Sequence, residues 1–89
     1  MSLGSGQASV STTAVMLYRA DGDGSIIALH NDGGGAGHPV FIGPIGVTVS
    51  TGLHMGGNEA SEHIHLDAGE AIYAIASNAV AVSFVTFHG

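Results

Sequence analysis

The chain has 89 residues, including fifteen glycines, no cysteine and a formal net charge of −6. This length makes one domain with a small core, and no disulfide can compensate for the limited burial. Arg19 is the single strong cation against seven carboxylates, so binding to nucleic acid or to an anionic membrane surface is not expected. Only 9% of the residues are charged, which favours a chain that hides much of its surface against other subunits.

The first nine residues, MSLGSGQAS, are rich in Gly and Ser and predict an N-terminal arm, followed by one β domain over residues 10–89. No stretch of ten residues has helical periodicity, whereas short runs of Val, Ile, Thr, Phe and Tyr alternate with Gly, Asn and Asp clusters. These runs predict strands over residues 10–19, 25–30, 40–43, 47–50, 62–66, 71–76 and 80–87.

The spacing of these runs predicts an all-β fold: a single small β-sandwich or barrel of about seven short antiparallel strands. Between them, RADGDGS at 19–25 is typical of a hairpin turn, and NDGGGAGHP at 31–39 predicts a longer glycine loop. The last two strands are apolar on both faces, which is typical of strands covered on both sides. A neighbouring copy would supply the second cover, so we expect a homo-oligomer, and a trimer in particular.

One segment, EHIHLDAGE at 62–70, has the composition of a metal site. Residues two apart in a strand face the same side, so His63 and His65 would project together, with Glu70 after the next turn. Imidazole nitrogens suit Zn, Ni, Fe or Cu. With Gly57, these three residues match the first motif of the cupins, and the segment resembles that family. The resemblance implies a small metal-binding enzyme as an alternative function.

The cupin pattern stops after this segment. Ser77 stands where the motif closes with glycine, and only twelve residues follow it, too few for a second motif with a third histidine. We therefore expect His63 and His65 to be solvent-facing strand residues and Glu70 to belong to a polar turn. No metal, cofactor or catalytic residue is predicted. Other histidines are expected to lie in solvated loops (His30, His38 and His54).

The second half of the chain has a more continuous resemblance. It carries VFIG at 40–43, GVT at 46–48, STG at 50–52, GEAIYAIA at 69–76 and a Val-rich strand from residue 80. This succession resembles small all-β structural proteins of tailed bacteriophages, especially phages of actinobacteria, over residues 38–87.

The phage resemblance implies a non-enzymatic virion protein that decorates and stabilises a capsid as a homo-oligomer. Its partners would be copies of itself and the major capsid protein. It would be made in the host cytoplasm and end on the capsid surface. A second alternative is a phage fibre or host-glycan-binding module, which would need an exposed aromatic cluster, and the chain has only five Phe and Tyr residues.

Overall fold

The structure is a computed structural model that describes residues 2–20, 22, 24–33, 38–57, 59–61 and 63–88. These residues form eight strands and no helix, so the described part holds no helix that could cross a membrane. The strands are β1 (Ser2–Val10), β2 (Val15–Arg19), β3 (Ser25–Asn31), β4 (Val40–Gly43), β5 (Leu53–Met55), β6 (Ile64–Leu66), β7 (Ala71–Ala76) and β8 (Val80–His88).

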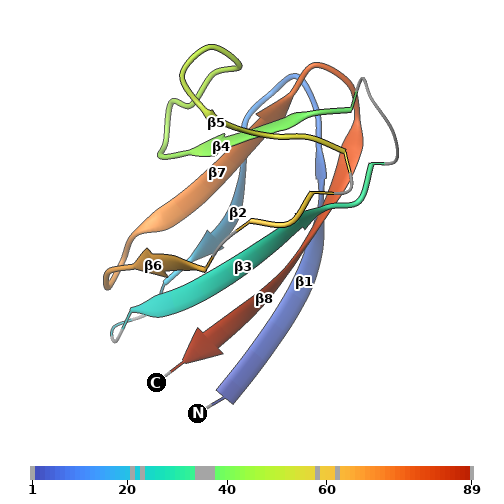
Figure 1. The fold of residues 1–89 in the computed structure, drawn as a ribbon. Coiled ribbons are helices and arrows are strands. Elements are labelled where there is room, and N and C mark those ends of the chain that lie inside the picture. Colours follow the sequence, from blue (N-terminus) through green and yellow to red (C-terminus); the bar gives the residue numbers. More distant parts are fainter. Residues whose placement is uncertain are drawn as a thin grey trace.

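The strands form two four-stranded antiparallel sheets that pack face to face (Figure 1). Sheet A has the order β1-β8-β3-β6, and sheet B has the order β2-β7-β4-β5. Successive strands alternate between the sheets except for β4 and β5, which are neighbours in sheet B, and this is the arrangement of a jelly roll, an eight-stranded double-sheet architecture. The predicted all-β sandwich is confirmed.

The core lies between the sheets and follows the period of two that each strand imposes. Along β3 and β7, every second residue is buried, beginning at Ser25 in β3 and at Ile72 in β7. Ile27, Val40 and Val82 are fully covered. Burying a side chain of this size contributes roughly 1.5–3 kcal/mol, so a few such residues decide whether this small domain folds.

The predicted N-terminal arm is wrong for most of its length, because Ser2–Val10 is strand β1, paired with β8 along all nine residues. Two features of β8 make glycine suitable there. Gly6 faces Phe84, whose ring covers the glycine, and Gly4 faces Thr86, whose hydroxyl would lie 2.7 Å from an added Cβ atom. A cross-strand aromatic that shields an edge glycine stabilises a strand that its own composition would disfavour.

The predicted strand over residues 10–19 is two strands in two different sheets. Val10 ends β1, residues 11–14 cross to the other sheet, and Val15 begins β2. The Ser11 carbonyl accepts a hydrogen bond from the Ala76 N–H at 2.9 Å, which fixes the crossing to the end of β7.

The strand predicted over residues 47–50 is a loop. The Val47 N–H donates to the Pro44 carbonyl at 3.0 Å, and the Thr48 hydroxyl accepts hydrogen bonds from the Ser50 and Thr51 N–H groups. Val47 is nevertheless buried, so its apolar side chain anchors a loop. The strand in this region is β5, which sequence reasoning missed.

The structure describes only some residues of the predicted turns. Gly69 adopts a φ of 81° in the turn before β7, where the sequence predicts a turn between His65 and Glu70. In the predicted turn at 19–25, Asp21 and Asp23 lie outside the described residues, as do residues 34–37 of the glycine loop.

Candidate functional site

The three residues of the predicted metal site lie on sheet A and the turn after it. His65 is exposed in β6, opposite Ile26 of β3. His63 is exposed just before β6, and its ring lies 5.4 Å from that of Phe87, centroid to centroid. Glu70 is exposed in the turn immediately before β7. The structure thus leaves these side chains on the surface.

The carboxylates of Glu70 and Glu59 each close a turn. Glu70 Oε1 accepts a hydrogen bond from the Asp67 N–H at 2.7 Å. Glu59 Oε1 accepts one from the Gly56 N–H. Within the described ranges, no three His, Cys, Asp or Glu side chains gather closely enough to hold a metal ion.

A hollow lies on the open side of the sandwich, between the short edge strands β5 and β6. Ile42, Leu53 and Ile64 form its apolar floor, and His54 and His63 line one part of it, which has a volume of ≈ 500 Å³. The same three apolar residues line the adjoining part, next to His65 and Glu70. The hollow therefore brings predicted site residues near an apolar surface, although the carboxylates are engaged in turns.

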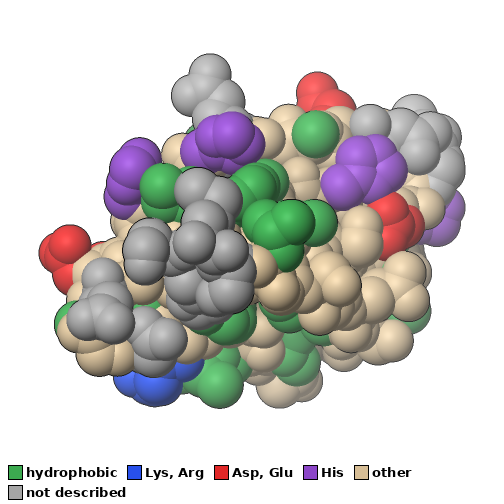
Figure 2. Space-filling model, turned by 90° about the horizontal axis from the view of Figure 1, so that it is seen from below, with side chains coloured by type: hydrophobic (Ala, Val, Ile, Leu, Met, Phe, Trp, Pro, Cys, Tyr) green, Lys and Arg blue, Asp and Glu red, His purple; other side chains and the backbone are tan. Residues whose placement is uncertain are grey.

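The outer face of sheet A carries a second candidate surface. Strand register places Leu3, Phe87, Ile26 and His65 in one row across all four strands. We call the apolar residues at this end of the face the apolar patch: Leu3, Ile26, Ala28, Val85 and Phe87. Leu3 is 68% exposed and Val85 39% exposed. Figure 2 shows hydrophobic side chains gathered between histidines on the face seen from below.

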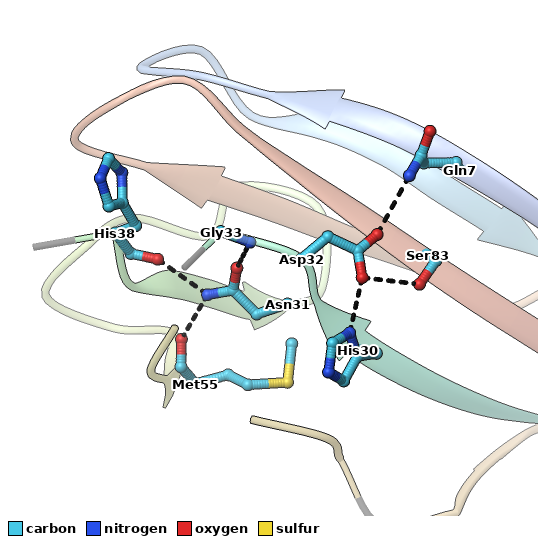
Figure 3. A network of polar contacts seen from close by, with 8 residues as sticks. All are labelled: Gln7, His30, Asn31, Asp32, Gly33, His38, Met55 and Ser83. Carbon is cyan, nitrogen blue, oxygen red and sulfur yellow. Dashed lines mark hydrogen bonds and ion pairs between the residues drawn. The ribbon is translucent and has the colours of Figure 1, made fainter. Parts of the chain in front are cut away.

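The other end of the same face is polar and centred on Asp32, which follows β3 (Figure 3). Asp32 Oδ1 lies 2.5 Å from His30 Nδ1 and accepts a hydrogen bond from the Ser83 hydroxyl at 3.1 Å. Asp32 Oδ2 accepts one from the Gln7 amide at 3.1 Å. These contacts tie β1, β3 and β8 together across the sheet.

The hydrogen bond from His30, and next that from Gln7, lower the pKa of the Asp32 carboxyl below its ordinary value of 3.8. The cluster contains the residue types of a Ser-His-Asp triad, yet its connections differ. The Ser83 hydroxyl donates to Asp32, whereas a nucleophilic serine must be hydrogen-bonded to the imidazole. The arrangement therefore supports a structural role and not acyl transfer.

Asn31, beside this cluster, points inward and is fully buried. Its amide nitrogen donates to the carbonyl of His38 at 2.8 Å and to that of Met55 at 3.1 Å, and its Oδ1 accepts from the Gly33 N–H (Figure 3). The residue joins β3 to β5 of the opposite sheet. Sequence reasoning ended the strand at His30 and placed Asn31 in the loop that follows, whereas β3 extends through Asn31.

Sequence reasoning missed the contacts of Asp32 with Gln7 and Ser83, because these residues lie 25 and 51 positions away from Asp32 in the sequence. Gln7 and Ser83 are ordinary strand residues whose partners depend on the register of β1 and β8. The one local signal is the alternation His30-Asn31-Asp32, which puts His30 and Asp32 on one face and Asn31 on the other.

No protein-family model matches the chain, and no curated protein matches it. A solved structure of a Bacillus endospore appendage, described as belonging to a family of disulfide-linked pili, has the same fold with a TM-score of 0.60. It is 13% identical in sequence, and the match covers 96% of this chain and 82% of that one. This likeness concerns the fold alone.

Proposed function

We propose that the chain is a non-enzymatic structural subunit, a virion protein that decorates and stabilises a phage capsid as a homo-oligomer. The observation that carries the proposal is the apolar patch on the outer face of sheet A. Leu3 and Val85 lie on a face that the described chain leaves open, and burial of such a patch against another protein is favourable. The phage assignment itself comes from the sequence resemblance over residues 38–87.

The charge distribution supports a surface made for packing. The chain carries one strong cation and seven carboxylates, and the apolar patch contains no formal charge. Few charged groups would need to be desolvated when the patch is covered. Covering it against a capsid lattice stabilises the shell because bound copies favour the assembled state by mass action.

A metal-binding enzyme remains the alternative that the sequence raised. It would use His63 and His65, but Glu70 and Glu59 already accept backbone hydrogen bonds in turns. A disulfide-linked polymer like the appendage neighbour is not proposed, because the 89 residues contain no cysteine.

The test is binding to undecorated shells assembled from the major capsid protein of the phage that carries this gene. The purified chain is mixed with the shells, bound copies are counted after sedimentation, and the shell melting temperature is measured. We expect saturable binding and a higher melting temperature. Absence of both would contradict the proposal.

Two variants make the test specific for the apolar patch. Val85→Lys puts a charge in the patch, and we expect it to weaken shell binding at least roughly tenfold, since charge is disfavoured at a buried interface. Ile45→Lys adds the same charge to an exposed residue of the β4–β5 loop, away from sheet A, and serves as the matched control. Equal weakening by both variants would argue against the patch.

A further inference from the structure

Among the described residues, β1 leaves one edge of sheet A open, and this edge has a defined set of unpaired backbone groups. The Asp32 N–H donates to the Ala81 carbonyl at 2.9 Å, so Ala81 directs its backbone groups toward β3. In an antiparallel sheet, successive residues of an inner strand direct their N–H and C=O groups to one neighbouring strand and then to the other. Phe84, three residues after Ala81, therefore directs its groups toward β1. Its partner Gly6, with the other even residues of β1, faces β8. The N–H and C=O groups of four odd residues consequently point outward (Leu3, Ser5, Gln7 and Ser9).

In the part of the chain that the structure describes, β1 pairs with β8 alone and forms the border of sheet A (Figure 1). Residues 2–10 contain no charge and no proline, and the register with β8 shifts nowhere. Native edge strands are normally protected by charge, proline, a bulge or short length. β1 has none of these protections.

The other described edges are protected. β5 and β6 have three residues each, so they offer little to pair with. β2 has five residues, a register shift between Met16 and Tyr18, and Arg19 at its end. Of these described edges, β1 is therefore the one best suited to pair with a further strand.

We propose that β1 pairs with β1 of a second copy, antiparallel and about a two-fold axis, to make one continuous eight-stranded sheet from two copies of sheet A. The inference deepens the proposed function and rests on its multi-copy assembly. With the axis at Gly6, Leu3 faces Ser9 of the second copy and Ser5 faces Gln7 of the second copy. All outward N–H and C=O groups of both strands are then paired, each facing pair exchanging two hydrogen bonds.

The residues at this axis suit a close approach. Gly6 would face its own copy in a pair without hydrogen bonds, where Cα atoms approach to about 4.5 Å and side chains crowd most. Gly6 has no side chain, and the next inward pair, Gly4 with Ala8, is also small. Two chains of net charge −6 repel each other overall, and β1 lets them meet along a stretch without charge.

We choose β1 of a second copy as the pairing strand because it matches the length of β1. A head-to-tail ring, as in the trimer expected from the sequence, would pair β1 with a different edge. The alternatives have three or five residues and would leave much of β1 unpaired. A two-fold dimer thus replaces the trimer in this proposal.

Sedimentation equilibrium with edge variants tests the pairing. We expect the full chain to associate reversibly to twice its 8.8 kDa mass. Ser5→Pro removes an outward N–H from each copy and none that faces β8, so the variant should stay folded, and its dimer dissociation constant should rise at least roughly tenfold. Ser5→Ala keeps the N–H and is the matched control. A monomer at all concentrations, or a folded Ser5→Pro variant that dimerises normally, would overturn the proposal.

A distance measurement decides the matter even if Ser5→Pro does not fold. The chain lacks cysteine, so Ser9→Cys gives a single site for a nitroxide label. In the proposed register the two Ser9 positions lie six residues apart along the sheet, which is about 20 Å at 3.4 Å per residue. An electron-resonance distance distribution centred near that value is expected, and a distribution without it would contradict the register.

The result is separable from that of the shell-binding experiment. A chain that binds shells but stays monomeric in solution and gives no label distance would refute β1 pairing and leave binding to the capsid intact. A chain that dimerises through β1 but ignores shells would keep the pairing and remove the capsid as its partner.

Discussion

Phe84 of β8 lies directly across from Gly6 of β1, and a Cβ atom on Gly6 would fall 2.6 Å from Phe84 Cζ. Phe84 is partly buried and packs against the core. The pair therefore joins an edge strand rich in Gly and Ser to the apolar interior. It explains how residues 2–10 form a strand despite their composition.

Gly6→Val should destabilise the domain, because its side chain would overlap the Phe84 ring and force the ring from its place. We expect a loss of about 1–3 kcal/mol in the free energy of unfolding, typical of overpacking. Urea denaturation measures it. Gly22→Ala is the control, since among the described residues an added Cβ there has no contact within 4 Å. Equal stability of Gly6→Val and wild type would show that the ring does not occupy this position.

Asn31→Ala should lower the free energy of unfolding by more than the loss of side-chain volume alone would. The substitution leaves the buried carbonyl of Met55 without the hydrogen bond that Asn31 donates, and it detaches Gly33 from the same side chain. An unsatisfied buried polar group costs about 1–3 kcal/mol, so a loss in that range or above is expected by denaturation. Ser77→Ala, at an exposed position between β7 and β8, is the reference. A loss equal to that of the reference would contradict the role of Asn31.

Asp32 should make stability depend on pH in the acid range. Its pKa is lowered in the folded chain, chiefly by the hydrogen bond from His30. A carboxyl with a depressed folded pKa adds stability above its unfolded value, here 3.8, and loses it as pH falls through the folded value.

Denaturation of the wild type and of Asp32→Asn at pH 6 and pH 3 measures this contribution. The stability difference between them should be larger at pH 6. Gln7→Ala should show part of the effect, because Gln7 is the second cause of the shift. A difference that is the same at both pH values would rule out a stabilising Asp32 carboxylate.

Metal binding through the histidines is expected to be absent. Elemental analysis after incubation with Zn²⁺ or Ni²⁺ and desalting should give well below one equivalent, unchanged by His63→Ala. Glu70 uses its carboxylate to accept a hydrogen bond from the Asp67 N–H, so of the three predicted ligands only the exposed imidazoles of His63 and His65 are free of such a turn contact. One equivalent of metal that His63→Ala removes would revive the cupin-like alternative.

Much of the fold could be predicted from local pattern. The strands at Val40–Gly43 and Ala71–Ala76 have the predicted bounds, because apolar runs between glycine turns specify them locally. β1 could not be predicted in this way, since its stability comes from Phe84 and Thr86, about eighty residues away in sequence. Residues 47–50 have strand composition, yet hydrogen bonds of Thr48 and the Pro44 turn hold them in a loop.

The candidate surfaces were predictable to a smaller extent. Sequence pattern identified His63, His65 and Glu70 and predicted that they lie on the surface, as the structure places them. The apolar patch depends on the register of β1, β8 and β3, which no local pattern fixes. Leu3 stood in a predicted arm, so its place beside Phe87 on sheet A could not be foreseen.

If the chain decorates a capsid as proposed, the outer face of sheet A is turned toward a partner on the shell. Electron cryomicroscopy of shells, imaged with and without the added chain, tests this most directly. We expect additional density in the shape of the eight-stranded sandwich at symmetric positions, with the apolar patch buried. Shells without added density, or bound copies whose apolar patch faces solvent, would contradict it.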